Sequence, residues 1–585
     1  MKRTLFALLL AACSSNVERP SPTPPPPWGV AISGGTMMIS RDGKLAIIAD
    51  PDRDRIVTVD LAKKDVVGEI ALEPGDEPGR LVEDGAGRIH VALRHGGALF
   101  TMASPTATTG LRRTACGEPR GLAWQASTDL VHVACTGGEL VSFAATGEAV
   151  RTLRLERDLR DVLVRGDHLV VSRFRTAELL TIDASGAVID RDASPIVKRS
   201  TSPQRSDCLN CGADSMPVIV DAIPAVAWRT VALPDGAMLV SHQRQVKGEM
   251  KSEPGGYDQG CGGGPVEHAV TVMRAGQPPF AVERLISGAL PVDVAVAPSG
   301  TKVAFAMAGS RLVHEVPMSS LSRPDREEDD DCGSRPEELR PVGFDLGAPT
   351  SIAYAPNDAL VIYYPESPAL VVGTEIIKLT GEVGYDSGRA MFHAATVSGL
   401  ACASCHPEAR DDGLVWDFTS IGPRRTQNVS GGILARAPFH WNGDMANLDQ
   451  LMTEVFALRM SGQSTTSART SLGPWLDRIP APKGVITDPA AVTRGQQLFD
   501  AVDVGCATCH SGAQLTNNQL FDVGRGRIKV PSLLGVGARA PFMHDGCAST
   551  LLDRFGVCGG GDAHGKTSQL NAAQLADLVA YLESL

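Results

Sequence analysis

The sequence has no excess of basic residues and no long apolar run, and each absence excludes a class of function. Its 585 residues include 55 Lys and Arg against 67 Asp and Glu, which gives a formal net charge of -12. A nucleic-acid-binding protein needs a basic face to displace counterions from phosphate, so this class is excluded. The apolar run 5–12 is too short to cross a bilayer as a helix. A chain of this length is expected to form two or three domains.

The N-terminus has the pattern of a secretory signal. Two positive charges precede the apolar run, and small residues lie directly before the expected cleavage point. The sequence Leu-Ala-Ala-Cys at 10–13 resembles the lipobox of bacterial lipoproteins, which implies removal of residues 1–12 and lipidation of Cys13. By the same resemblance, Ser14 implies export to the outer membrane, with the protein facing the periplasm. The following Pro-rich linker, 13–29, is expected to be extended as polyproline II.

Two copies of the pattern C-x-x-C-H lie in the C-terminal third of the chain. In this pattern two thiols one helical turn apart add to the vinyl groups of a haem, and the histidine binds its iron. A zinc half-site or a redox dithiol is the alternative for a single copy, but a thioredoxin-type dithiol needs a βαβ context that neither copy has. We therefore predict two covalent c-type haems, one at Cys402, Cys405 and His406 and one at Cys506, Cys509 and His510.

The haem unit is duplicated beyond the pentapeptide. The segment 436–443, R-A-P-F-H-W-N-G, returns at 539–546 as R-A-P-F-M-H-D-G. Each copy should then hold its distal iron ligand at a matching position, and Met460 and His564 each lie 54 residues after the histidine of their motif. Both residue types bind haem iron, so we predict these two as the distal ligands. The competing candidates nearby are His440, Met445, Met452, Met543 and His544.

Residues 30–380 have the sequence pattern of an all-β domain. Short β-rich runs alternate with turn signals such as Asp42-Gly43, and the early runs recur about every 40 residues, as propeller blades do. Seven copies of this strand pair begin near residues 39, 78, 119, 159, 226, 291 and 349. We predict a closed seven-bladed β-propeller, and the region resembles the propeller repeat proteins of bacterial surfaces and periplasm. Its expected role is a platform for docking or for a substrate.

The remaining cysteines indicate an oxidising compartment. Of thirteen cysteines, eight remain when Cys13 and the four haem thiols are set aside, and an even number permits four disulfides. We predict one disulfide, Cys116–Cys135, between neighbouring strands of one blade and another, Cys547–Cys558, beside the second haem. The other four form disulfides of unassigned pairing or a zinc site of four thiolates: Cys208, Cys211, Cys261 and Cys332.

An acidic run, 325–331, follows the sixth strand pair. It lacks the alternating, glycine-turned spacing of a calcium loop. We expect a solvated face there, with calcium binding as the alternative.

From about residue 384 the apolar period changes from two to 3.6 residues, which indicates an all-α region. The pair Asp488-Pro489 is expected to begin a helix that leads into the second motif, and Asn571 with Gln574 forms the capping box of a C-terminal helix. This pair of helices resembles the one that crosses beside the haem in cytochrome c folds. We predict an all-β propeller followed by an all-α di-haem region, with cytochrome c domains at 381–480 and 481–585.

The region 384–585 resembles the bacterial di-haem cytochrome c peroxidase family, including its methylamine-maturation relatives. The haem motifs, the helix openings 388–392 and 494–499, and the repeated segments carry the resemblance. In that family a tryptophan between the haems is implicated in electron passage, which implies this role for Trp441. Packing against porphyrin is the alternative role. His544 becomes a candidate residue of the second haem pocket.

The ligand pattern departs from that family. Its members have a bis-histidine, peroxide-reactive haem in the first half and a His/Met haem in the second. Here no histidine lies between His406 and His440, and the equal offsets give methionine to the first haem. Methionine raises the reduction potential, so the first haem is expected to be the better electron acceptor.

Peroxide chemistry needs a releasable sixth iron ligand and an acid or base to cleave the O–O bond. Two six-coordinate haems that only transfer electrons need neither a releasable ligand nor an acid or base. We therefore expect electron transfer with a redox protein partner, and a basic one suits the acidic chain. A peroxidase-type enzyme is the alternative, and a sensing propeller whose haems report redox state is the third.

Overall fold

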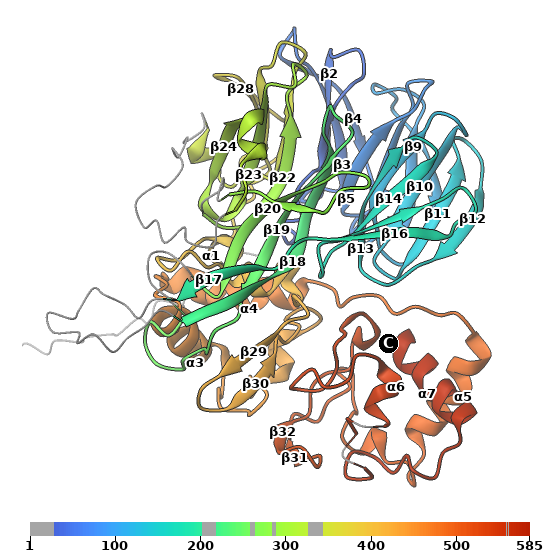
Figure 1. The fold of residues 1–585 in the computed structure, drawn as a ribbon, viewed down its shortest axis with the longest axis vertical. Coiled ribbons are helices and arrows are strands. Elements are labelled where there is room, and N and C mark those ends of the chain that lie inside the picture. Colours follow the sequence, from blue (N-terminus) through green and yellow to red (C-terminus); the bar gives the residue numbers. More distant parts are fainter. Residues whose placement is uncertain are drawn as a thin grey trace, which may run out of the picture.

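The computed structural model shows an N-terminal β-propeller and a C-terminal helical region that lies against one end of it (Figure 1). The structure describes residues 29–201, 218–257, 264–283, 288–325, 343–556, 558–559 and 561–585. The predicted signal, Cys13 and nearly all of the linker lie outside these residues, as do the four cysteines of unassigned pairing. Within the described ranges, no helix is long and apolar enough to span a membrane.

Seven antiparallel sheets form the propeller, which confirms the predicted fold class, and the chain completes each blade before it begins the next. The first four blades are β1–β4 (Met37–Ile39, Leu45–Asp50, Arg55–Asp60, Asp65–Ala71), β5–β8 (Pro78–Glu83, Ile89–Leu93, Ala98–Met102, Gly110–Thr114), β9–β12 (Pro119–Gln125, Leu130–Cys135, Glu139–Ala144, Ala149–Arg154) and β13–β16 (Leu159–Arg165, His168–Arg173, Glu178–Ile182, Val188–Ala193). The last three are β17–β21 (Val197–Thr201, Val218–Ala232, Met238–Val246, Val266–Met273, Phe280–Ala281), β22–β24 (Pro291–Val296, Lys302–Met307, Leu312–Pro317) and β25–β28 (Ser351–Tyr354, Leu360–Tyr364, Ala369–Val372, Glu375–Lys378).

The innermost strands close the ring. Each contacts the innermost strand of the next blade, and β25 of the last blade contacts β1 of the first. Apolar side chains fill the space between blades: Ile48 and Val57 of the first blade pack with Val361 and Tyr363 of the seventh, and all four are fully buried. Burial of this apolar surface, at about 25 cal/mol per Å², is the main stabilising term for such an interface.

The strand pair β18–β19 reaches from the propeller to the helical region (Figure 1). The side-chain amide of Gln243 donates to the carbonyl of Ser404 at 2.9 Å. The side-chain amide of Gln245 donates to the carbonyl of Val415 at 2.6 Å. Because Ser404 lies between Cys402 and Cys405, the fifth blade is tied directly to the first C-x-x-C-H motif.

Both predicted disulfides are present. Cys116 lies in the link between β8 and β9 rather than in a strand, so its bond ties that link to β10. The expectation of a solvated acidic run is wrong for Asp325, whose carboxylate is buried against Arg199 at 2.7 Å and Arg244 at 2.8 Å. Residues 326–331 lie outside the described residues, as does any site that they form.

The helical region contains two units of the same plan. The first has α1 (Ser387–His393), α2 (Cys402–Cys405), α3 (Leu448–Leu451), the π-helix η6 (Met452–Arg459) and α4 (Thr466–Arg478); the second has α5 (Pro489–Asp500), α6 (Leu551–Arg554) and α7 (Ala572–Ser584). Each unit also has a short hairpin that the sequence analysis did not predict, β29–β30 (Val415–Phe418, Gly422–Arg425) and β31–β32 (Leu520–Asp522, Arg527–Lys529).

The first and last helices of each unit pack closely at a glycine. Asp488 caps α5 and Asn571 caps α7, as predicted. A Cβ atom on Gly495 of α5 would lie 2.0 Å from the carbonyl oxygen of Asp577 in α7. In the first unit, a Cβ atom on Gly388 of α1 would lie 2.4 Å from the amide nitrogen of Leu472 in α4. Only glycine permits such backbone approach, so in each unit the first and last helices come into close backbone contact at a glycine.

Candidate haem-binding site

The first motif is a single helical turn. The amide of His406 donates to the carbonyl of Cys402 at 2.9 Å, which sets the two thiols and the imidazole on one turn. The side chain of Ser404 accepts from the amide of Ala401 at 3.1 Å and closes the start of this turn.

The second motif has the same geometry. Its turn, η7 (Cys506–Thr508), begins after Gly505, whose φ is +81°. The amide of His510 donates to the carbonyl of Cys506 at 3.0 Å. The structure therefore gives both copies the arrangement that the spacing predicts.

Each motif histidine is oriented by a backbone carbonyl. Nδ1 of His406 donates to the carbonyl of Arg410 at 3.1 Å, and Nδ1 of His510 donates to the carbonyl of Leu515 at 3.2 Å. Because Nδ1 carries the proton, Nε2 keeps the lone pair that a metal needs. Burial lowers the pKa of both imidazoles, to about 4 for His510, so both rings are neutral at physiological pH.

The four motif thiols are free and are poor thiolates. None of the four forms a disulfide. Burial raises the pKa of Cys402 to about 12 and also raises the pKa of Cys405, Cys506 and Cys509. A redox dithiol has a lowered thiol pKa. These surroundings therefore argue against the dithiol alternative and are compatible with thioether attachment.

One cavity reaches both motifs. It is lined by the motif cysteines and histidines, and by Met460 and His564. Its walls are largely apolar, formed in the first unit by Phe392, Leu400, Phe456 and Leu472 and in the second by Phe499, Leu551, Phe555 and Leu578. A porphyrin needs such walls, paired thiols and an imidazole, and the residues present fit a c-type haem at each motif.

His564 lies opposite His510. Their ring centres are 6.3 Å apart and their planes are inclined by 36°. Two imidazoles whose ring centres are this far apart could both bind one metal ion placed between them, at metal–nitrogen distances of about 2 Å. Burial, with Arg554 nearby, lowers the pKa of His564 well below its usual range, so this ring is also neutral and able to bind a metal.

Met460 is buried at the C-terminal end of η6. Its amide donates to the carbonyl of Val455 at 3.0 Å, and its carbonyl accepts from the hydroxyl of Ser398 at 2.7 Å. Both bonds fix its backbone at the wall of the cavity. Of the competing candidates, His440 and Met452 line the first unit's part of the cavity, and Met543 and His544 line it at the second unit's repeated segment.

Trp441 and His544 meet where the two units join. Their ring centres are 6.3 Å apart. The amide of Arg425 donates to the carbonyl of His544 at 2.7 Å, and the amide of Lys529 donates to the carbonyl of Trp441 at 2.8 Å. Arg425 and Lys529 each end the hairpin of their unit. The junction is therefore reciprocal, with equivalent residues making equivalent bonds in both directions.

The propeller supplies part of the first unit's cavity wall, which the sequence analysis missed. Met250 and Tyr257, from the link between β19 and β20, line this cavity. The amide of Met250 donates to the carbonyl of Asp417 at 2.7 Å, and Tyr257 contacts Phe418 with ring centres 6.3 Å apart. No local sequence signal marks these residues, because they lie about 150 positions before the motif.

Comparisons with known proteins give one family match and several similar chains. The chain is 27% identical over 256 residues to hydrazine synthase subunit gamma of Kuenenia stuttgartiensis, covering 32% of this chain and 72% of the relative. Similar solved structures include Kuenenia stuttgartiensis hydrazine synthase (16% identity, 60% of this chain, 97% of that chain, TM-score 0.44) and virginiamycin B lyase from Staphylococcus aureus (10%, 61%, 95%, 0.35). Residues 492–585 match the cytochrome c family, so this part of the chain is a cytochrome c domain, a fold that binds haem covalently.

Proposed function

We propose that this protein is an exported di-haem c-type cytochrome that transfers electrons between periplasmic or surface redox partners. The observation that carries the proposal is the single cavity that reaches both C-x-x-C-H motifs, with Trp441 and His544 in contact where the units join. The match of residues 492–585 to the cytochrome c family supports a covalently bound haem at the second motif.

The two sites have different ligand sets. We assign His406 and Met460 to the first iron, and His510 and His564 to the second. A bound c-type haem supplies reversible one-electron chemistry at its iron. Thioether ligation by Met460 favours the reduced state, whereas two imidazoles favour the oxidised state, so the first site has the higher potential. The apolar walls exclude water from both sites and keep these ligands in place.

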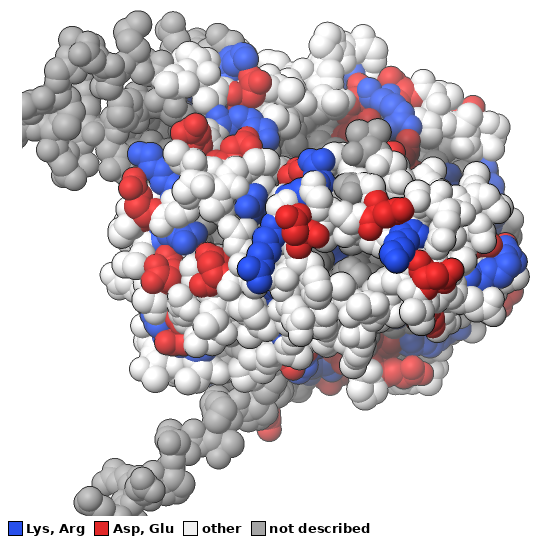
Figure 2. Space-filling view, turned by 90° about the horizontal axis from the view of Figure 1, so that it is seen from below, with Lys and Arg blue, Asp and Glu red and all other residues white. Residues whose placement is uncertain are grey.

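A surface groove gives a partner access to this cavity. The groove is lined by both hairpins, including Arg424, Arg525 and Arg527, and His544 lines both the groove and the cavity. The face away from the propeller otherwise carries basic and acidic side chains in mixture (Figure 2). Charges beyond about 8 Å are largely screened at physiological salt, so the local arginines outweigh the net charge. Asp545 also lines the groove and pairs with Arg525. The remaining charges of the groove, Arg424 and Arg527, fit an acidic patch on the redox partner, in place of the basic partner expected from the net charge. The propeller remains the broader docking or substrate platform.

Mass spectrometry and a redox titration test the proposal together. The mature chain should carry two haem masses, and two low-spin, one-electron transitions should appear at separate potentials. Replacing Cys402 and Cys405 by Ala should remove one haem, and replacing Cys506 and Cys509 should remove the other. A wild-type chain with fewer than two haems, made in cells able to attach them, contradicts the proposal.

Peroxide reduction is the second candidate, and one observation favours it. Nδ1 of His440 lies 3.1 Å from a carboxylate oxygen of Asp444, and both residues line the cavity. An imidazole oriented by a carboxylate can move protons during O–O cleavage, which consumes two electrons and two protons per peroxide. Peroxide turnover that is lost in His440→Gln would establish this activity. Peroxide left untouched by the half-reduced protein would leave electron transfer alone.

Export and lipid anchoring are part of the proposal and rest on residues 1–14. Cys13→Ser should abolish fatty-acid labelling and release the protein into the soluble periplasmic fraction. Unchanged labelling would overturn the assignment of Cys13.

A further inference from the structure

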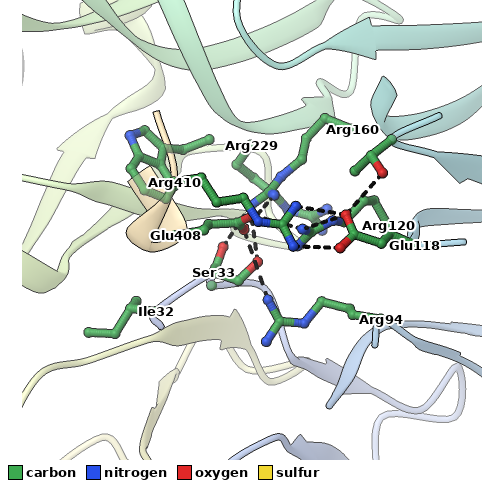
Figure 3. A network of polar contacts seen from close by, with 12 residues as sticks. Ile32, Ser33, Arg94, Glu118, Arg120, Arg160, Arg229, Glu408 and Arg410 are labelled. Carbon is green, nitrogen blue, oxygen red and sulfur yellow. Dashed lines mark hydrogen bonds and ion pairs between the residues drawn. The ribbon is translucent and has the colours of Figure 1, made fainter. Parts of the chain in front are cut away.

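The segment after the first haem motif enters the propeller (Figure 3). Glu408 lies two residues after His406, in the turn η4 (Pro407–Ala409). Its carboxylate contacts Nη1 of Arg160 at 2.6 Å and Nη2 of Arg120 at 2.9 Å, and Arg94 lies 3.9 Å away. These arginines belong to three consecutive blades: Arg94 follows β6, and the other two lie in β9 and β13.

A second ion pair holds the other end of this segment. Nη1 of Arg410 donates to Glu118 at 2.7 Å, and Glu118 directly precedes β9. The carbonyl of Arg410 is also the group that accepts the Nδ1 proton of His406. The propeller therefore holds the segment whose carbonyl, that of Arg410, accepts the hydrogen bond from His406.

The second haem unit provides an internal comparison. The residue two positions after His510 is Gly512, with φ +71° and open space where a side chain would lie. Glu408 also has a positive φ, of +56°. A left-handed conformation is unfavourable for a residue with a Cβ and persists where the surroundings fix it. The first unit therefore has a glutamate, Glu408, at a position where glycine fits a positive φ better. The ion pairs of its carboxylate account for this residue.

The ion pairs of Glu408 are also buried. Arg120 and Arg160 contact its carboxylate, and the exposed fractions of the Glu408, Arg120 and Arg160 side chains are 7%, 5% and 4%. An ionised carboxylate in a buried cluster of arginines cannot leave it without losing these partners.

We propose that Glu408 is a positioning residue for His406, held by the arginines of the propeller, so that the propeller forms part of the first haem site. The inference rests on the proposed function, because it requires a haem at the first motif. A carbonyl bound to Nδ1–H makes the imidazole a stronger donor to iron and favours the oxidised state. Loosening the segment weakens this bond and raises the potential of the first haem.

Arg160→Gln tests the inference by the sign of the shift. Loss of a positive charge alone lowers the potential of a nearby haem, because the reduced state is then less stabilised. If the loss of Arg160 instead releases Glu408 and the Arg410 carbonyl from their positions, the potential of the first haem rises. Arg229→Gln is the matched control: this arginine pairs with Asp161 at 3.0 Å and Asp293 at 3.2 Å on neighbouring inner strands. We expect an upward shift of the first potential in Arg160→Gln, a downward or negligible shift in Arg229→Gln, and an unchanged second potential in both.

A second measurement covers the case in which Arg160→Gln fails to fold. In Glu408→Gly, which copies Gly512, the Nδ1 proton of His406 should exchange with solvent at least several-fold faster in NMR than in the wild type, while that of His510 should not change. A fall in the first potential of Arg160→Gln, or an unchanged exchange rate in Glu408→Gly, overturns the inference while both haems are present. A wild-type chain that lacks a haem at the first motif overturns the proposed function and this inference with it.

Discussion

The rings of Trp441 and His544 lie with their centres 6.3 Å apart and their planes inclined by 60°. They occupy equivalent positions of the duplicated segments 436–443 and 539–546. The duplication therefore places one aromatic ring from each unit at the junction, where the indole N–H of Trp441 also donates to the carbonyl of Arg425 at 2.7 Å. Such a pair offers conjugated side chains in contact between the two proposed haem sites.

Replacing Trp441 by leucine should slow electron exchange between the two haems. The leucine removes the conjugated ring and opens a gap at the junction. We expect a loss of about tenfold, equivalent to ~1.4 kcal/mol of added barrier. Flash photolysis or pulse radiolysis of the half-reduced protein measures this rate. Trp124→Leu, on the third blade, is the control and should leave the rate unchanged. An unaltered rate in the Trp441 variant would leave only a packing role for this residue.

Replacing His564 by alanine should convert the second haem from low to high spin. The ring centres of His510 and His564 are 6.3 Å apart, so both could bind one iron placed between them. EPR and optical spectra report the spin state, and added imidazole should restore the low-spin form. His168→Ala, on β14, is the control. A second haem that stays low-spin without His564 would assign the distal ligand to another residue.

Replacing Met460 by alanine should abolish the weak near-infrared sulfur-to-iron band. It should also lower the first midpoint potential, by roughly a tenth or more of the ~0.8 V range that axial ligands span. Met452→Ala is the matched control, because Met452 is also buried and lines the same cavity. Loss of the band in Met452→Ala, with the band retained in the Met460 variant, would reverse the assignment.

The features that the sequence predicts here are those with local signals. The seven strand pairs, the caps at Asp488 and Asn571, and the C-x-x-C-H turns all follow from residues within a few positions of one another. Neighbouring cysteines predict the two disulfides, and both are present. Short-range geometry and turn chemistry are sufficient for each of these.

The features that the sequence does not predict depend on contacts between distant segments. Glu408 and Arg160 are separated by 248 positions, and Tyr257 reaches the first unit from a propeller link. Asp325 is a further example, because an acidic run predicts a solvent-exposed face. Its burial depends on Arg199 and Arg244, which are distant in the sequence. Only the closed propeller and the docked helical region place these groups together.

Gly495→Ala should destabilise the second unit, although alanine is the better helix former. Helix propensity favours alanine by about 1 kcal/mol. The added Cβ would lie 2.0 Å from the carbonyl oxygen of Asp577, so α5 and α7 must separate, and overpacking of this kind costs about 1–3 kcal/mol. We expect a net loss of up to about 2 kcal/mol by thermal or urea unfolding. Gln496→Ala, at an exposed position of α5, should be neutral or stabilising. A more stable Gly495 variant would show that the helices do not approach so closely.

Asp412 should make stability depend on pH near neutrality. Its carboxyl is buried, and burial raises its pKa from 3.8 to about 7. Between these values the folded chain keeps a proton that the unfolded chain has lost. Stability therefore falls as pH rises through this window, by up to about 1.4 kcal/mol per pH unit, and is level above it.

Asp412→Asn removes this titration and should raise stability at pH 8 by on the order of 2 kcal/mol, with little effect at pH 4. Urea midpoints of the haem-loaded protein at pH 4, 6 and 8 give the comparison. Asp411→Asn is the matched control with the opposite sign: although burial opposes ionisation, Arg175 and Arg425 lower the pKa of Asp411. Its contribution is present above the unfolded pKa and is lost as pH falls, so this variant should be less stable at pH 8. Equal pH profiles for the wild type and Asp412→Asn would show that Asp412 ionises in the folded protein as it does in water.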